Sequence, residues 1–341
     1  MGSSIQPGYA PGQRRLTPRE VEQTLASQRP AKFISGRQLL EGECEQIPML
    51  IEPLVPQVGL TALVGGSDVG KSSFLRQLAT AVALGDSTFL GFRLNTRNRR
   101  AIYVSTEDDE GHVRFLLRVQ SEVRGLPASA YDGLSYLFET EDVLSDLQEM
   151  LSQYPADLII LDAYSDLFTG QLNDAQQVRA FLSGFHQMAV RFKCAVILLH
   201  HTGKYKDEQQ PSKHHVVGSQ AFEAKMRLVL ELRPDVLDAD TLHLCILKGN
   251  YLPNAQKQQT YVLRRDQAMT FHTTGQRNEL SSLQRPARAE TGGYTLAKYQ
   301  EAKEMRDAGK TLDEIAVALG YQHRSAISKL IHKFEDGQTP A

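Results

Sequence analysis

The 341-residue chain has few cysteines, a net charge near zero and no long apolar run. Its three cysteines, Cys44, Cys194 and Cys245, lie far apart, and the last two fall in apolar, strand-like runs. This spacing argues against a disulfide framework or a zinc site and is typical of small buried side chains in a reduced protein. No apolar run approaches the roughly 18 residues of a membrane span, and no signal-peptide core begins the chain. We therefore expect a soluble, cytoplasmic protein.

The formal net charge of −2 at pH 7 excludes a strong overall positive field, so any contact with nucleic acid has to come from local patches. The length suggests about two domains, one of them large enough for a substantial core. Residues 1–32 are rich in Gly, Pro, Gln, Ser and Arg and predict a flexible lead-in, with a short helix around Pro18–Ala26.

From Ile47 onward, apolar strands alternate with amphipathic helices, which predicts a doubly wound α/β fold with a mostly parallel sheet. We expect strands at 60–64, 101–105, 134–138, 158–161 and 194–201, and helices at 71–84, from 109, 141–153 and 173–192. Shorter strands separated by turns predict antiparallel hairpins that complete the sheet, at 228–233, 241–248, 259–266 and 268–272. Residues 273–293 have no periodicity and predict a linker.

The motif Gly65-x-x-x-x-Gly70-Lys71-Ser72 follows a predicted strand and opens a predicted helix. In this context glycines let backbone N–H groups converge on phosphates, the helix N-terminus adds positive potential, and the lysine reaches the β- and γ-phosphates. The Ser72 hydroxyl is suited to Mg²⁺. The predicted site for ATP and Mg²⁺ consists of Gly65, Gly66, Ser67, Asp68, Val69, Gly70, Lys71, Ser72 and Ser73. We expect the anionic Asp68 to contact solvent, a neighbouring subunit or the linker rather than phosphate.

Acidic residues follow two other strands. Asp162 ends the apolar run in "DLIILDAYSDLF", where a carboxylate would hold Mg²⁺ through water, and its strand is predicted to be adjacent to the phosphate-loop strand. Glu107 of "STEDD" is the favoured base for polarising an attacking water, with Asp108 as the alternative.

Histidines follow a further buried strand in "LLHHTGK", where His200 or His201 could hydrogen-bond the γ-phosphate. Two more histidines stand at positions 214 and 215, but no cysteine or carboxylate spacing beside the four supports a metal site.

From about Phe33 to Thr273 the chain resembles the RepA-type hexameric helicases and related RecA-fold ATPases, in the same broad group as DnaB. The motifs that carry the resemblance are "IPMLIEPLVPQVGLTALVGGSDVGKSS", "YVSTED", "LIILDAYSDLFTGQLNDAQQVRAFLSGF", "AVILLHHTGK", "GSQAFEAKMRLVLEL" and "ILKGNY". The resemblance implies catalytic roles for Glu107 and for the histidine pair, of which His200 is our first candidate. It also implies that Arg227 and Lys248 act on a neighbouring subunit's phosphates, so that hydrolysis requires a ring, with a hexamer favoured.

The polar stretch at 201–220 matches a loop that faces the central channel in such rings. Lys204, Lys206 and Lys213 are predicted to follow a single-stranded DNA backbone, and Tyr205 to stack on a base. A solvated loop without this role is the alternative.

Residues 294–334 predict three helices, the second begun by a capping box of Thr311 and Glu314. The pattern is similar to helix-turn-helix modules of the homeodomain or resolvase type. The third helix is then predicted to present to a major groove Gln322, His323, Arg324, Ser325, Lys329 and Lys333. A helical protein-interaction module is the alternative.

These observations predict an α/β, RecA-like P-loop ATPase domain at 33–273, a linker at 274–293, an all-α helix-turn-helix domain at 294–334 and a tail at 335–341. The expected function is Mg²⁺-dependent ATP hydrolysis coupled to DNA binding or unwinding, in replication or maintenance of a plasmid or other mobile element. The alternatives are an ATP-gated DNA-binding regulator or assembly adaptor without helicase activity, and a protein-remodelling switch. Residues 1–45 are too few and too polar to form the additional N-terminal domain of a DnaB-like helicase.

Overall fold

A computed structural model describes residues 33–42, 46–202, 210–212, 220–235, 238, 240–283, 296–321 and 324–335. The chain divides into two units, residues 1–47 and 48–341. The described part of the first unit contains the helix α2 (Gly36–Leu40), begun by a capping box of Ser35 and Gln38. The helix expected around Pro18–Ala26 and the side chain of Cys44 lie outside the described residues.

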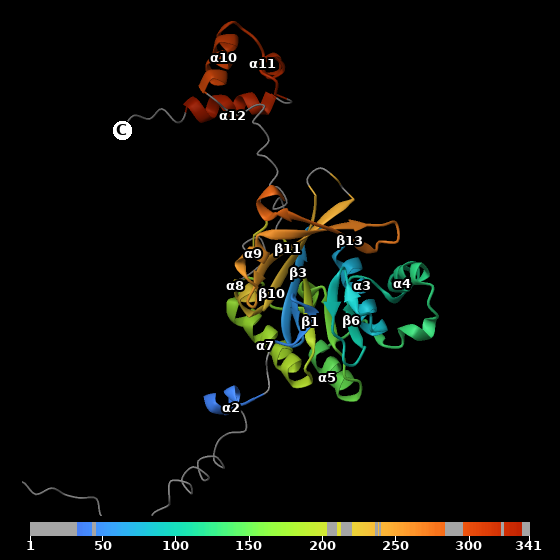
Figure 1. The fold of residues 1–341 in the computed structure, drawn as a ribbon. Coiled ribbons are helices and arrows are strands. Elements are labelled where there is room, and N and C mark those ends of the chain that lie inside the picture. Colours follow the sequence, from blue (N-terminus) through green and yellow to red (C-terminus); the bar gives the residue numbers. More distant parts are fainter. Residues whose placement is uncertain are drawn as a thin grey trace, which may run out of the picture. The chain divides into compact units, whose positions relative to one another are not determined.

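The second unit contains a nine-stranded sheet among its described residues, in the order β13-β12-β11-β10-β3-β9-β8-β6-β7 (Figure 1). The strands from β10 to β7 in this order are parallel, whereas β11, β12 and β13 continue the sheet antiparallel beyond β10. The bounds are β3 (Gly59–Gly65), β6 (Ala101–Ser105), β7 (Leu134–Leu137), β8 (Leu158–Asp162), β9 (Ala195–His201), β10 (Leu228–Pro234), β11 (Thr241–Gly249), β12 (Gln259–Arg265) and β13 (Phe271–Glu279). The predicted RecA-like α/β class, mostly parallel with antiparallel edge strands, is confirmed.

The strand order corrects one expectation. The strand that carries Asp162, β8, is not adjacent to the phosphate-loop strand β3, because β9 lies between them and pairs with both. All three strands are buried apolar runs, so their sequences hold no information on which of them are neighbours.

Helices cover both faces of the sheet and bury alternate residues of its strands. On one face, α3 (Lys71–Leu84) contributes Phe74, Leu75 and Leu78 to a core with Leu63 and Ile197. On the other face, α5 (Val143–Gln153) and α7 (Ala175–Phe192) pack against the intervening residues of the same strands. The remaining helical segments of this region are α4 (Glu110–Arg124), η1 (Ala128–Tyr131), α6 (Tyr164–Leu167), α8 (Gln220–Lys225), α9 (Asn254–Lys257) and η4 (Leu280–Leu283).

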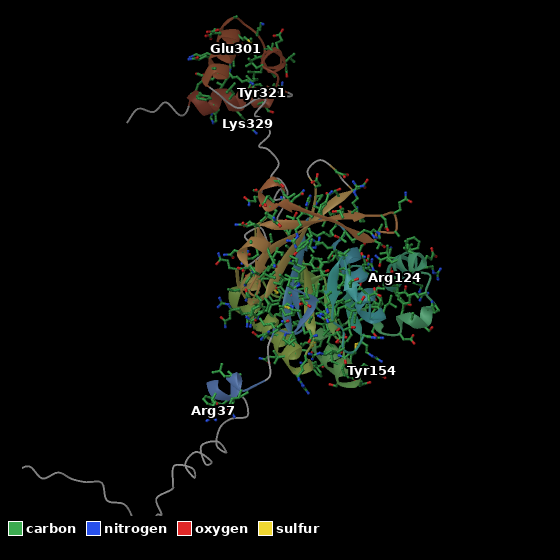
Figure 2. All side chains as sticks on the ribbon, in the orientation of Figure 1. Arg37, Arg124, Tyr154, Glu301, Tyr321 and Lys329 are labelled. Carbon is green, nitrogen blue, oxygen red and sulfur yellow. The ribbon has the colours of Figure 1, made fainter. Side chains whose placement is uncertain are left out.

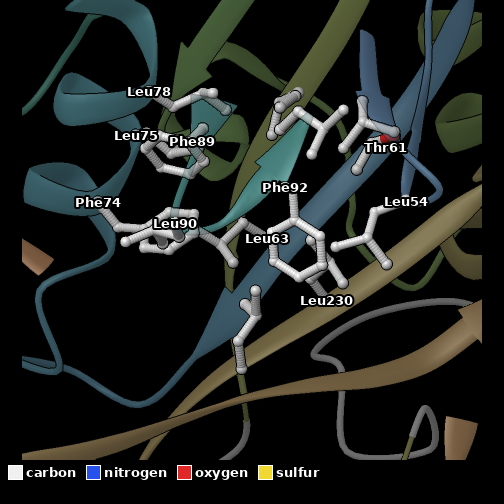
Figure 3. A pocket seen from close by; sticks show the side chains of 14 residues that line it. Leu54, Thr61, Leu63, Phe74, Leu75, Leu78, Phe89, Leu90, Phe92 and Leu230 are labelled. Atoms are coloured by element: carbon white, nitrogen blue, oxygen red, sulfur yellow. The ribbon is translucent and has the colours of Figure 1, made fainter. Parts of the chain in front are cut away.

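A four-stranded sheet packs beside α3, in the order β2-β1-β5-β4. Its strands are β1 (Met49–Glu52), β2 (Val55–Pro56), β4 (Thr88–Phe89) and β5 (Phe92–Leu94). A pocket between this sheet, α3 and the large sheet is lined by apolar side chains apart from Thr61 (Figure 3). With one polar lining residue, the pocket is part of the hydrophobic core rather than a polar ligand site.

The last strand of the large sheet differs from the prediction. We expected a strand at 268–272 followed by a linker, but β13 begins at Phe271 and pairs with β12 as far as Glu279. After Phe271 its side chains are exposed, so the sequence lacks the apolar alternation by which strands are recognised. The residues 274–279 therefore belong to the sheet and not to a linker.

Three helices near the C-terminus form their own small core. They are α10 (Leu296–Asp307), α11 (Leu312–Ala318) and α12 (Arg324–Glu335). Thr311 and Glu314 make the predicted capping box, and Ala302, Ile315 and Ile327 are fully buried among the three helices. None of the helices in the described ranges is long and apolar enough to cross a membrane.

Candidate functional site

Gly65 ends the central strand β3 and begins the phosphate loop. A Cβ on this residue would lie far inside van der Waals contact with the backbone carbonyl oxygen of Leu232, on β10, and 3.2 Å from Val69. Glycine is therefore required here by the close approach of two strands, before any phosphate is considered.

The remainder of the loop turns through left-handed backbone conformations at Asp68 (φ 62°) and Gly70 (φ 88°). Val69 between them is buried and packs into the core, which fixes the loop, whereas the Asp68 side chain is exposed. Aspartate tolerates the left-handed region better than most residues. A Cβ on Gly70 would lie 2.8 Å from the Arg265 guanidinium, so this glycine too answers a steric need.

The metal-binding candidates Ser72 and Asp162 lie close together, because α3 begins beside the end of β8. The Tyr103 hydroxyl, on β6, donates to Asp162 Oδ2 at 2.5 Å. Burial raises the pKa of Asp162, against the opposing effect of hydrogen bonds from Tyr103 and Ser72. The other oxygen, Oδ1, is buried and makes no hydrogen bond of ordinary geometry to the described residues. A buried carboxylate oxygen beside a serine hydroxyl suits a hydrated Mg²⁺.

Lys71 is also held at the loop. Its side chain is buried, and its Nζ donates to the carbonyl oxygen of Gly66 at 2.6 Å. The lysine is thus folded over the turn formed by the backbone of the phosphate loop, where its charge is directed at any phosphate bound by that turn.

Glu107 and Asp108, which the sequence left as alternatives, have different surroundings. Glu107 lines the pocket of the phosphate loop, and its Oε1 is 3.8 Å from Nε2 of His201. Asp108 turns the other way and forms an ion pair with the buried Arg76, with 3.3 Å between Oδ2 and the guanidinium nitrogen. The geometry therefore favours Glu107 as the base.

The two histidines lie on opposite faces of the sheet, because they are consecutive residues of β9. His201 lines the phosphate pocket, together with Leu199. His200 is almost fully buried on the other face, with its ring 5.0 Å from that of Tyr164 and 4.8 Å from that of Phe222. Our first candidate, His200, thus does not reach the pocket in this structure, and His201 does.

The turn between β12 and β13 forms the remaining wall of the pocket. Arg264, Arg265, Asp266, Gln267 and Met269 all line it. The turn is held to the phosphate-loop helix and to α4, since Gln120 donates to the carbonyl oxygens of Ser73 and Met269 at 3.4 Å each. The sequence predicted a hairpin here but no role for it in the site.

Arg227 and Lys248 lie at the opposite edge of the sheet. Arg227 directly precedes β10, and its backbone N–H donates to the carbonyl oxygen of Leu60, near the start of β3. Lys248 pairs with Val229 at the end of β11 and forms an ion pair of 3.1 Å with Glu223. The length of β3 puts this edge roughly 20 Å from the phosphate loop. Neither cation can therefore reach the pocket of its own chain.

Most of the predicted DNA-binding residues lie outside the described residues: Lys204, Lys206, Lys213, Gln322 and His323, as well as the side chain of Lys333. Three others lie on α12, namely Arg324, Ser325 and Lys329, and their side chains are exposed (Figure 2 labels Lys329).

Two residues of the site were missed by the sequence analysis, Arg76 and Tyr103. Tyr103 lies in an all-buried strand, where a tyrosine ordinarily contributes only its ring, and Arg76 lies in an amphipathic helix, where an arginine is ordinarily on the surface. A sequence signal for Arg76 existed, because it follows Leu75 and precedes Leu78 on the buried side of α3.

A phosphate loop between a central strand and a helix, with a carboxylate at the end of a strand two positions away, defines a P-loop ATPase that binds ATP, typically with Mg²⁺. A family model described as "AAA domain" matches residues 27–207, slightly more than half of the chain, and the protein belongs to this family. No curated protein matches the sequence. Among solved structures, the ATPase domain of another protein is similar with a TM-score of 0.48 and 12% identity, over 63% of this chain and 84% of that one.

Proposed function

We propose that the protein hydrolyses ATP with Mg²⁺ at the edge of the sheet where β3, β6, β8 and β9 end. The observation that carries this proposal is the convergence of Lys71, Ser72, Asp162 and Glu107 on one pocket from separate elements. Lys71 and the loop amides would hold the phosphates, while Ser72 and Asp162 would hold the water shell of Mg²⁺. The bound metal supplies charge stabilisation for phosphoryl transfer.

Glu107 would orient the attacking water and accept its proton at Oε1. Its carboxylate is half-exposed at the pocket, and His201 stands beside it at 3.8 Å. His201 would then report the state of the γ-phosphate in place of His200. The β12–β13 turn on the far wall would meet the part of the nucleotide beyond the phosphates.

We further propose that the sites are completed between subunits of a RepA-type ring, a hexamer being favoured. The distance of Arg227 and Lys248 from their own phosphate loop supports a role on the neighbour's nucleotide. A mixing experiment tests this: Arg227→Ala and Lys71→Ala subunits, each inactive alone, should recover part of the ATPase activity when mixed. Recovery is expected because some interfaces then combine an intact loop with an intact arginine. No recovery in assemblies of proven mixed composition would contradict completion between subunits.

We propose DNA as the partner and plasmid or mobile-element replication or maintenance as the setting. The exposed Arg324 and Lys329 on α12 support duplex binding, and the 201–220 segment would contact single strands. A full-length Arg324→Ala, Lys329→Ala variant should lose duplex affinity and show a shallower salt dependence, with DNA-free ATPase activity unchanged. The matched control is Lys303→Ala, Arg306→Ala on α10. Equal loss in both would refute α12 as the recognition helix.

The decisive measurement is the ATPase rate with and without single-stranded DNA, together with the mass of the assembly and strand displacement on a forked duplex. Stimulation, a ring mass and displacement are expected. Binding and stimulation without displacement would favour the ATP-gated regulator. A monomeric mass without stimulation would overturn the ring helicase.

A further inference from the structure

Arg76 is a fully charged side chain buried in the second turn of the phosphate-loop helix. It is 1% exposed, and its guanidinium is 3.3 Å from Asp108 Oδ2. Because an unpaired buried guanidinium is strongly destabilising, the Asp108 carboxylate has a structural reason to stay at this place. The pair thus ties the loop after β6 to the helix that begins with Lys71.

The same loop is fixed on both sides of Glu107. Before it, the backbone N–H of Thr106 donates to the carbonyl oxygen of Asp162 at 2.8 Å. After it, the carbonyl oxygen of Asp108 accepts a hydrogen bond of 2.7 Å from the Ser105 hydroxyl. The Asp108 side chain is held by Arg76, so Glu107 is the residue of this turn whose side chain is directed at the phosphate pocket.

We infer that Arg76 and Asp108 are a positioning pair, which sets the distance and direction of Glu107 relative to the phosphate loop. The inference rests on the proposed ATP hydrolysis by Glu107. Since Arg76 and Lys71 share one helix, the pair fixes the base and the phosphate-binding lysine in one frame. A misplacement of about 1 Å in such a frame lowers turnover by up to about 100-fold without removing binding.

The test uses Asp108→Asn in the full-length protein, a change that removes the charge and keeps the shape. We expect kcat for ATP to fall between about 10- and 100-fold, with KM and the affinity for a fluorescent ATP analogue nearly unchanged. The matched control is Asp109→Asn, one residue further on. Asp109 is exposed and caps α4, and asparagine caps a helix equally well. This variant should keep its activity.

A second background separates positioning from general loss of structure. Glu107→Gln alone should lower kcat by about 100-fold or more with ATP binding retained. Adding Asp108→Asn to Glu107→Gln should then have little further effect, because the pair acts through Glu107. Arg76→Lys, which keeps the charge but not the fork, should retain part of the activity if it folds.

The outcomes distinguish the two levels of the argument. If Glu107→Gln hydrolyses ATP normally, the proposed role of Glu107 fails, whatever Asp108 does. If Glu107→Gln is inactive but Asp108→Asn is as active as Asp109→Asn, or lowers kcat by the same factor in both backgrounds, the positioning role is refuted.

Discussion

Replacement of Gly65 by alanine tests why the phosphate loop begins with glycine. The added Cβ would meet the carbonyl oxygen of Leu232, which belongs to the buried strand β10 and cannot rotate away. Forced displacement in a packed core destabilises by about 1–3 kcal/mol, and the positive φ adds about 1 kcal/mol. We therefore expect a loss of roughly 2–4 kcal/mol in the free energy of unfolding, or roughly 4–15 °C in Tm.

The matched control is Gly125→Ala, at the C-terminal end of α4. Gly125 also has a positive φ, of 61°, but no atom lies within 4 Å of an added Cβ. This variant should lose only the backbone contribution, about 1 kcal/mol. Thermal unfolding followed by circular dichroism compares the two, and titration with a fluorescent ATP analogue measures the effect on the loop.

The collision predicts weaker nucleotide binding as well as lower stability in Gly65→Ala, since the loop and β10 have to move apart. If Gly65→Ala and Gly125→Ala unfold at the same temperature, the close approach to Leu232 is not what requires glycine. If Gly65→Ala is stable but binds no nucleotide, the glycine serves the phosphate and not the sheet.

Three further predictions concern the same unit. Asp162→Asn should abolish hydrolysis but raise Tm at pH 7 without nucleotide, because a raised carboxyl pKa means that the charged form is disfavoured in the folded state; the gain should vanish near the ordinary value of about 3.9, and an equal gain at pH 4 would refute the reasoning. His201→Ala should lower kcat with little change in Tm, whereas His200→Ala should lower Tm through lost ring packing, and the reverse pattern would exchange their roles. Leu63→Ala should lower the free energy of unfolding in urea by about 2–5 kcal/mol, since Leu63 is buried against the apolar pocket, and a loss below about 1 kcal/mol would contradict that packing.

Local signals in the sequence predicted the features that depend on neighbours along the chain. The helix at 71–84 was predicted with its observed bounds, because a phosphate loop precedes it and a glycine in the left-handed conformation follows it. Asp174 was one of the two predicted caps of α7, and its side chain accepts from the N–H groups of Gln176 and Gln177.

Features that depend on partners distant in sequence could not be predicted in this way. The insertion of β9 between β3 and β8 involves three all-apolar strands without distinguishing marks. The choice between His200 and His201 depends on which face of β9 each residue occupies, and a strand buried on both faces gives no alternation from which to infer it. The pairing of Arg76 with Asp108 joins a helix and a loop that are 32 residues apart.

The two ends of β10 have a consequence for the stoichiometry of the proposed assembly. Leu232, towards one end, contacts the phosphate-loop strand, and Arg227 stands just before the other end. Each subunit thus carries one half-site at each edge of its sheet, and contacts between unlike edges are head-to-tail. A closed ring of n subunits then has n complete sites, whereas an open chain has n − 1. ATPase activity per subunit should therefore be about half of its maximum in a head-to-tail dimer and reach that maximum only when the ring closes.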